Sequence, residues 1–323
     1  MVTLSELVSI LIPVYNREGI ISETLDSALA QTYRNIEVIV VDNASTDRTW
    51  SIIQTYAERD QRIRAFRNDT NIGPVRNWRR AVEEARGVYG KILWSDDLIA
   101  PEYLERTIPY FDEDVGFVYS VVRIFTKNTD SGNCLYFIEG VGAYSSEDFV
   151  VRALYDRNVP VSPGCAVFRM ADLRKNLLVD VANQVGSDFA MHAIGNDLLI
   201  FLLTCLDYER VVLIPEVLAF FRAHEGSISV SSRSGKIPLH YLLAKSFFVD
   251  KYFCQERERL AALAKILLIK YPRSRKYGMT DVSVFFENPV SVDGPFMARL
   301  ILEEVAGLPG RLVKRISRSV SAR

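Results

Sequence analysis

The sequence predicts an α/β fold, with a mostly parallel sheet flanked by helices on both faces and a helical C-terminal appendage. Through the first hundred residues, short apolar runs that suit strands buried on both faces alternate with apolar residues at helical spacing. Such alternation implies right-handed crossovers, which place successive strands in a parallel sheet. Beyond residue 230 only helical spacing continues. The pattern therefore predicts a sheet-based unit followed by a helical region.

The first hundred residues supply the sheet's leading strands. Strands are expected over 8–12, 36–41, 63–66 and 91–94. Helical spacing fills the stretches between them, with Ser22 expected to cap the first helix and Ser45 or Thr46 the second. The carboxyl ends of parallel strands share one edge of a sheet, and ligands bind outside that edge. We therefore expect the functional residues where these strands end.

Less regular elements follow. Helices are expected over 101–111, 145–157 and 194–206, and strands over 115–125, 165–168 and 211–214. The appendage is expected to hold helices over 239–253, 257–270 and 296–319. A boundary near 231–235 gives one domain over 1–230 and a helical region over 231–323.

Composition narrows the class of protein. The chain has 323 residues, of which 49% are apolar, enough for one full-sized core. Lys and Arg number 39 against 40 for Asp and Glu, which argues against a nucleic-acid partner. The four cysteines form no CxxC pair and lie among apolar neighbours, which favours buried, reduced thiols and a cytoplasmic location. No signal peptide or membrane-spanning stretch is indicated.

Polar side chains follow three of the expected strands. The first strand runs into Tyr15 and Asn16, the second into Asp42, and the fourth into Asp96 and Asp97. Asp42 alone could cap the next helix. Two adjacent carboxylates repel one another unless a cation or a donor lies between them, and oxygen ligands suit Mg²⁺ or Mn²⁺. These residues predict a divalent metal site at the sheet edge.

A cation beside such an edge suggests diphosphate binding. The chain contains neither G-x-G-x-x-G nor G-x-x-x-x-G-K-[ST]. Backbone N–H groups of a glycine-rich loop therefore cannot be the main phosphate ligands, which argues against dehydrogenases and P-loop enzymes.

Several motifs in order resemble family 2 glycosyltransferases. The resemblance runs over about 7–105 and resumes over 160–230. The motifs are Pro13-Val14-Tyr15-Asn16, Ser27 to Tyr33, Val40 to Asp47, Asn71-Ile72-Gly73, Asn77-Trp78, Ala85-Arg86-Gly87 and Ser95-Asp96-Asp97. The resemblance implies a GT-A fold, in which 1–105 binds a nucleotide sugar and 106–230 binds the acceptor.

The resemblance also implies roles for single residues. The turn from Pro13 through Val14 and Tyr15 to Asn16 would hold the nucleotide together with Asp42, which would accept the uracil imide N–H and favour UDP donors. Further donor contacts are implied for Asn71, Arg76, Ser95 and Asp96. For Arg76, a solvated helix-face role is an open alternative.

The metal ligands implied by the resemblance are Asp96, Asp97 and His224, holding Mn²⁺ or Mg²⁺. Trp94 occupies the place of the first Asp in the family's Asp-x-Asp motif. This departure affects one ribose or metal contact. His224, in Arg222 to Ser227, could instead be structural.

Asp197, which matches the Asp of the family's Glu-Asp segment, is implied to be the general base. It would take the proton of the acceptor hydroxyl, with inversion at the anomeric carbon. Asn196 replaces the family's frequent Glu. Asp188 is the alternative base, and for Asp197 a helix-capping role is the alternative.

The expected function is thus metal-dependent transfer of a sugar from a nucleotide sugar to a saccharide or lipid-linked acceptor, in surface polysaccharide, lipopolysaccharide or glycolipid synthesis. A non-catalytic nucleotide-sugar-binding subunit and a sugar-nucleotide pyrophosphorylase are the alternatives. The apolar, then basic tail over 296–323 could contact the inner face of a membrane. A packed or solvated terminal helix is the alternative for this tail.

Overall fold

The sheet begins with four parallel strands, as expected. A computed structural model describes residues 6–138, 142–223, 235–290 and 292. In it β1 (Val8–Val14) lies between β2 (Ile36–Asp42) and β4 (Tyr89–Ile92), and β3 (Ile63–Arg67) pairs with β2. All seven residues of β1 and of β2 are buried, because both faces of the sheet are covered.

The strand order places a topological switch point beside β1. The chain moves outward from β1 to β2 to β3 and then returns to the other side of β1 as β4. Crossovers of one hand therefore put the helix between β3 and β4 on the face opposite the two earlier helices. A switch point of this kind opens a crevice outside the carboxyl ends of its strands, here the ends of β1 and β4.

The second half completes the sheet in mixed orientation. β9 (Ala166–Arg169) joins β4 to β6 (Val115–Phe125), antiparallel to both. β10 (Arg210–Arg222) runs parallel to β6, and β5 (Leu98–Ile99) pairs with its far end. Short strands β7 (Asn133–Leu135) and β8 (Ala143–Ser145) pair with β6 and β10. Since β5 directly follows Asp97, its pairing with β10 brings Arg222 to the expected metal site.

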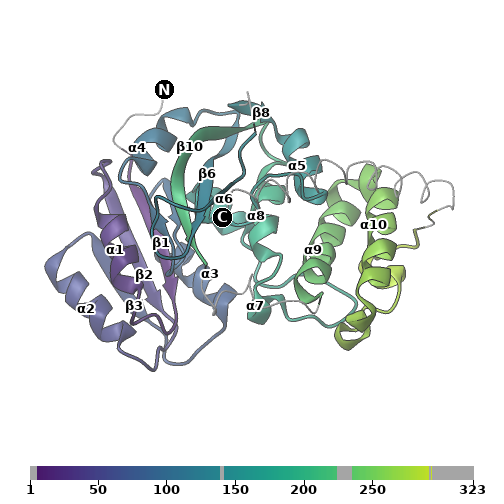
Figure 1. Cartoon of the computed structure of the whole chain (residues 1–323), viewed down its shortest axis with the longest axis horizontal. Helices are drawn as coiled ribbons and strands as arrows, with labels where there is room; N and C mark the ends of the chain where they lie inside the picture. Colours follow the sequence, from purple (N-terminus) through teal and green to yellow (C-terminus); the bar gives the residue numbers. More distant parts are fainter. Residues whose placement is uncertain (1–5, 139–141, 224–234, 291, 293–323) are drawn as a thin grey trace.

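Helices cover the sheet and continue beyond it (Figure 1). Those of the sheet unit are α1 (Ile21–Leu29), α2 (Thr49–Arg59), α3 (Pro74–Glu84), α4 (Tyr103–Thr107), α5 (Ser146–Leu154), α6 (Met170–Asn176), α7 (Phe189–His192) and α8 (Asn196–Thr204). The C-terminal helices are α9 (Lys236–Tyr252) and α10 (Arg257–Lys270). Short 3₁₀ segments lie at 108–110, 163–165, 254–256, 272–277 and 282–285. α9 packs between α8 and α10, so the C-terminal helices extend the molecule away from β3 (Figure 1).

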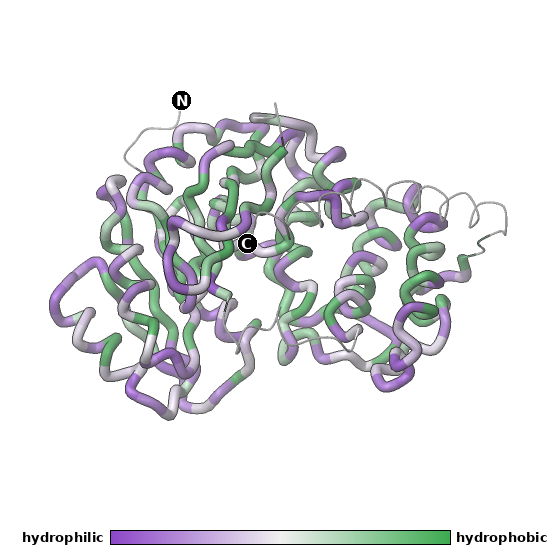
Figure 2. The backbone as a smooth tube through the Cα atoms, viewed as in Figure 1, coloured by the Kyte–Doolittle hydropathy of each residue, from purple (hydrophilic) through white to green (hydrophobic). Residues whose placement is uncertain are grey.

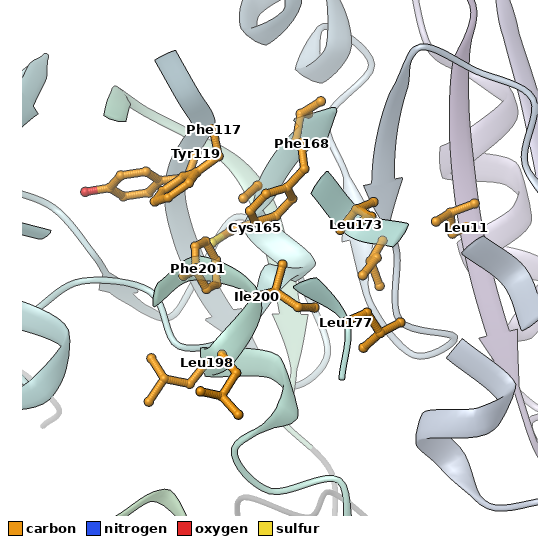
Figure 3. Close-up of a cluster of buried hydrophobic side chains, with 14 of the residues drawn as sticks. Leu11, Phe117, Tyr119, Cys165, Phe168, Leu173, Leu177, Leu198, Ile200 and Phe201 are labelled. Carbon is orange, nitrogen blue, oxygen red and sulfur yellow. The ribbon is translucent and has the colours of Figure 1, made fainter. Parts of the chain in front are cut away.

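Apolar residues concentrate in the strands and in α8 (Figure 2). Phe117, Phe168 and Phe201 meet between β6, β9 and α8, with ring centroids 4.9 to 5.4 Å apart (Figure 3). Phe201 contacts both other rings and is fully buried. Such ring pairs stabilise a core beyond the area they bury. This cluster fixes α8 on the sheet and, with it, the position of Asp197.

We expect Phe201→Ala to lower the free energy of unfolding by about 3–5 kcal/mol, because the lost ring leaves a cavity among the other rings. Urea unfolding measures this change. Ile269→Ala is the control: its side chain is 80% exposed, so its effect should stay within about 0.5 kcal/mol. Equal losses in the two variants would contradict the assigned core.

The α/β class is confirmed, but several predicted helix caps and element boundaries differ from those in the structure. Helices α1 and α2 begin after Ile20 and Arg48 without a side-chain cap, so the caps expected at Ser22 and at Ser45 or Thr46 are wrong. β4 starts two residues earlier than expected because its register is set by β1. α6 and α7 were not expected. The helix expected over 296–319 lies outside the described residues, as does most of the predicted domain boundary.

The cysteine expectation is half right. All four thiols are free, but only Cys165 and Cys205 are buried, whereas Cys134 and Cys254 are exposed. In the described ranges, no helix combines the length and apolar character that a bilayer crossing needs.

Candidate active site

The turn after β1 is bonded to the turn after β2. Asn16 has a φ of 50°, a left-handed conformation that Asn tolerates. Its backbone N–H donates to Ser45 Oγ at 2.9 Å, and its Oδ1 accepts from Thr46 N at 2.9 Å. Pro13 and Val14 are buried, so their side chains face the core and only Tyr15 is exposed in this turn. The 13–16 segment can therefore offer a ligand its backbone and the Tyr15 ring.

Asp42 is fully buried at the end of β2. Its carboxylate accepts from Ser45 N at 3.2 and 3.3 Å and pairs with Arg67 Nε at 3.1 Å. Arg67, at the end of β3, is 42% exposed. At the end of β2 and β3, the solvent-facing side chain is thus that of Arg67, and the buried Asp42 carboxylate forms an ion pair with it. Sequence reasoning missed Arg67, since only the β2–β3 register reveals it.

Asn71 belongs to the same edge. Asn43, next to Asp42, donates through its amide to Asn71 Oδ1 at 2.9 Å, and Gly73 N donates to the same oxygen at 3.0 Å. Arg76 follows in the first turn of α3 and lies 3.9 Å from the exposed Asp180. An exposed pair at that distance contributes little, so it does not fix the Arg76 side chain.

The turn after β4 carries the two neighbouring carboxylates. Asp97 is only 5% exposed, and its Oδ1 accepts from Arg222 N at 2.9 Å. Asp96 Oδ2 lies 3.7 Å from an Arg17 guanidinium nitrogen, and its backbone oxygen accepts from Arg222 Nε at 2.9 Å. Ser95 is buried beside them. Burial and the adjacent Asp96 charge raise the pKa of Asp97 well above its usual value.

These contacts join the strand ends into one continuous network. Asp42 binds Ser45, Ser45 binds Asn16, and Arg17 donates to Asn16 O at 3.2 Å while facing Asp96. The sequence prediction that Asp42 and the Asp96-Asp97 turn belong to one edge therefore agrees with the geometry. Arg17 and Arg222, which hold that turn, were not predicted as site residues, although Arg222 stands in the quoted 222–227 segment and Arg17 directly follows the quoted 13–16 motif.

Lys91 adds a buried cation beneath this turn. Its ammonium group donates to the backbone oxygens of Ile92, at 3.1 Å, and Gly164. Burial lowers its pKa to about 7, partly offset by the charge of Asp97. A lysine inside a strand gives no sequence signal of this kind, and we did not expect it.

Asp197 lies in the first turn of α8 and is buried. Its Oδ1 accepts from Gly195 N at 3.0 Å and Leu198 N at 2.9 Å, and its Oδ2 accepts from Tyr241 at 2.6 Å. Burial raises the pKa of Asp197 to about 6, although these hydrogen bonds lower it. The carboxylate thus combines a structural role at the helix start with a pKa that suits a general base.

The alternative base has a different setting. Asp188 is exposed and caps the short helix α7, accepting from Met191 N at 3.2 Å. Its neighbour Ser187 contacts His192 Nε2 at 2.9 Å, while His192 Nδ1 accepts from Ile194 N at 3.0 Å. Because Nδ1 accepts a hydrogen bond, the proton of the neutral His192 ring is on Nε2, which donates to Ser187 Oγ. His192 therefore cannot take a proton from Ser187, and Ser187 is not activated as a nucleophile. His224 lies outside the described residues.

Comparisons with known proteins identify the family. The model for Glycosyl transferase family 2 matches residues 9–177, half of the chain. The chain belongs to glycosyltransferase family 2. The match contains every residue of the strand-end network except Arg222, and it ends before Asp188 and Asp197.

Curated relatives of this family-2 chain match over less than half of it. A glycosyltransferase, GlyG, from Streptococcus pneumoniae is 28% identical over 47% of this chain and 48% of its own length. UDP-Glc:alpha-D-GlcNAc-diphosphoundecaprenol beta-1,3-glucosyltransferase WfaP from Escherichia coli is 40% identical over 36% of this chain and 45% of its own length. The chain spans less than half the length of these curated relatives.

Solved structures share the GT-A fold of the family. TarS 1-349 from S. aureus in complex with UDP-GlcNAc superposes with a TM-score of 0.61 at 20% identity, over 85% of this chain and 75% of the TarS 1-349 chain. Mannosyltransferase PcManGT from Pyrobaculum calidifontis in complex with GDP-Man and Mn²⁺ gives 0.53 at 18% identity, over 93% and 80%. These matches confirm the fold and extend into the C-terminal helices.

The family-2 chain departs from the Asp-x-Asp pattern at Trp94, and the structure shows what Trp94 does. Its ring packs on Trp78 at 4.7 Å between centroids, and its N–H donates to Ser162 Oγ at 2.8 Å. A Cβ added at Gly164 would come within 2.9 Å of the Trp94 ring. The 163–165 turn also contacts α8, so Trp94 links the end of β4 to the helix that bears Asp197.

The residues at the β4 end suit a divalent cation. The described part of the chain contains no group of three or more acidic, His or Cys side chains placed to hold a metal. It does contain the Asp96-Asp97 pair, in which burial and the Asp96 charge raise the pKa of Asp97. Mg²⁺-type sites use one or two carboxylates together with substrate phosphates, which matches this pair.

Proposed function

We propose that this protein transfers a sugar from a UDP-sugar to a hydroxyl of a saccharide or lipid-linked acceptor, with inversion at the anomeric carbon. The observation that carries the proposal is the network of strand-end residues at the β1–β4 switch point, from Asp42 through Asn16 and Arg17 to Asp96. The switch-point crevice is where such sheets bind nucleotides. Membership in family 2 supplies the reaction class.

Donor binding is proposed to use both sides of the crevice. The Tyr15 ring and the backbone of 13–16 would hold the base and ribose, together with Asp42 at the end of β2. Oδ1 of Asp42 accepts one hydrogen bond, and its remaining lone pair would serve the uracil imide N–H once the paired Arg67 side chain moves, because Asp42 is fully buried in this structure. Arg67 and Arg76, both partly exposed, would approach the diphosphate with Asn71 between them. The names of WfaP and the TarS complex, which include UDP-Glc and UDP-GlcNAc, favour UDP.

Asp96 and Asp97 are proposed to hold Mn²⁺ or Mg²⁺, with His224 as a further ligand. When bound, such an ion neutralises charge on a leaving diphosphate. Arg222 contributes by fixing the turn: it donates to Asp97 Oδ1 and Asp96 O and pairs with Glu23 at 2.6 Å. These contacts orient the Asp97 carboxylate and hold the backbone of Asp96 before a donor arrives.

Asp197 is proposed as the general base. As the acceptor oxygen bonds to the anomeric carbon, the bond from that carbon to the diphosphate oxygen breaks and the acceptor proton passes to Asp197. A base near pKa 6 is ionised at neutral pH and still takes up a proton readily. Asp188 stays the alternative.

The first test is donor binding. We expect a UDP-sugar with Mn²⁺ to raise the melting temperature, and GDP-mannose to raise it less, because selective binding stabilises the folded state. The panel is UDP-glucose, UDP-N-acetylglucosamine, UDP-galactose and GDP-mannose. Ile269→Ala, at an 80% exposed position in α10 outside the proposed donor contacts, is the control and should respond as the wild type does. No response to any UDP-sugar would refute the donor assignment.

Turnover separates the two alternatives from the proposal. Release of UDP from the selected donor is expected for a transferase, whereas a non-catalytic binding subunit would be stabilised by donor and release nothing. Formation of UTP from donor and pyrophosphate would indicate a pyrophosphorylase instead.

A further inference from the structure

The hydrogen bonds of Asp197 leave little freedom for its carboxylate. A carboxylate has about four lone-pair sites, two on each oxygen. Oδ1 uses both, for Gly195 N and Leu198 N, and Oδ2 uses one, for Tyr241. One site on Oδ2 therefore remains for a substrate proton. Its direction is set by the phenol that occupies the other site.

Tyr241 comes from outside the sheet unit. It lies on α9, 44 residues beyond Asp197, and α9 packs along α8. Burial and the Asp197 charge raise the pKa of Tyr241 well above its usual value, so the phenol stays a neutral donor at any working pH. A short hydrogen bond from a neutral donor to a carboxylate is among the stronger ones.

From this contact we infer that Tyr241 is a positioning residue for the transfer reaction, fixing the free lone pair of Asp197 through the C-terminal helical region. The inference rests on the proposed role of Asp197 as base. It assigns the region after residue 235 a part in transfer, which a purely structural appendage would not have.

Near Asp197 and Tyr241, the other titratable groups are a neutral phenol and a carboxylate that is already paired with a lysine. Tyr136, after β7, contributes a part-buried neutral phenol near both Asp197 and Tyr241. Asp156, after α5, faces Tyr241 and is paired with Lys245 Nζ at 2.7 Å. Lys245 lies one helical turn after Tyr241 on α9 and has almost no solvent exposure. The same helix face thus supplies the donor for Asp197 and neutralises the nearest other carboxylate.

Removing the phenol oxygen has a defined consequence. The Tyr241 hydrogen bond stabilises the ionised form of Asp197 and so lowers its pKa. Without the bond, the pKa rises above about 6, and the ionised fraction at acidic pH falls. The effect vanishes well above the new pKa, where Asp197 is ionised in both proteins.

The experiment uses the full chain with Tyr241→Phe, and Tyr155→Phe as matched control. Tyr155 is also a part-buried phenol bonded to a carboxylate, that of Glu256, away from Asp197. The pKa of Asp197 is read without substrate by carbon-13 NMR of aspartate carboxyls, assigned with Asp197→Asn. We expect Tyr241→Phe to raise it by about one pH unit, and transfer at pH 5 to fall about tenfold with little change at pH 8. Tyr155→Phe should match the wild type in both readings.

An unchanged carboxyl titration in Tyr241→Phe would overturn the inference. So would a titration that moves while the acidic limb of the rate profile stays in place. Wild-type transfer by Asp197→Asn would instead overturn the proposed base itself, and the substrate-free titration keeps these two failures apart.

Discussion

Asp197→Asn is expected to lower transfer by about a hundredfold or more, the usual scale of general-base catalysis, while donor binding stays intact. An amide cannot take up the acceptor proton. It can keep the local fold, since its oxygen accepts from Gly195 N and Leu198 N as the carboxylate oxygen does now. The measurement pairs UDP release in the presence of acceptor with the melting-temperature response to donor.

The control is Asp188→Asn. Asp188 is exposed and accepts only from the backbone of α7, so its replacement should leave transfer within about twofold if Asp197 is the base. A large loss in Asp188→Asn together with near-normal transfer in Asp197→Asn would move the base to Asp188. Equal large losses would show that the α7–α8 segment, and not one carboxylate, governs the rate.

The sequence predicted the centre of the sheet well because β1 and β2 are buried on both faces. The continuous apolar run of residues 8–12 and the similar run of 36–41 have few structural alternatives. Helix starts were less predictable. Ser22 has a residue type typical of caps but lies inside α1, because the chain entering the helix is held by Arg17 O, which accepts from Ile20 N and Ile21 N.

The site was predictable in its carboxylates and not in their partners. Asp42, Asp96 and Asp97 end strands, and strand ends can be read from a local pattern. Arg67, Arg222 and Tyr241 reach these groups or Asp197 only through the registers and packing of distant elements. A single sequence contains no local signal for such pairs, so burial and the resulting pKa shifts appear only in the structure.

Removal of divalent ions is expected to lower transfer by about a thousandfold or more, with recovery on addition of Mn²⁺. Lewis-acid stabilisation of a leaving group contributes several kcal/mol, and each 1.4 kcal/mol changes a rate about tenfold. The structural reason for expecting this dependence is the Asp96-Asp97 pair. Burial of Asp97 and the charge of the adjacent, part-exposed Asp96 both disfavour the ionised form of Asp97, so a cation bound between the two carboxylates would stabilise that form.

Asp97→Asn should weaken binding of the divalent ion by removing one of its two proposed carboxylate ligands. We expect Mn²⁺ with UDP to raise the melting temperature of the wild type and not that of Asp97→Asn. Asp172→Asn is the control, because Asp172 is 6% exposed, close to the 5% of Asp97, and burial likewise raises its pKa, but its partner is Tyr208. The two variants lose the same charge at similar depth, so a difference between them reports on the strand end itself. Unchanged turnover in excess chelator would contradict the metal site. Asp96 and Asp97 would then have only a structural role, through their contacts with Arg17 and Arg222.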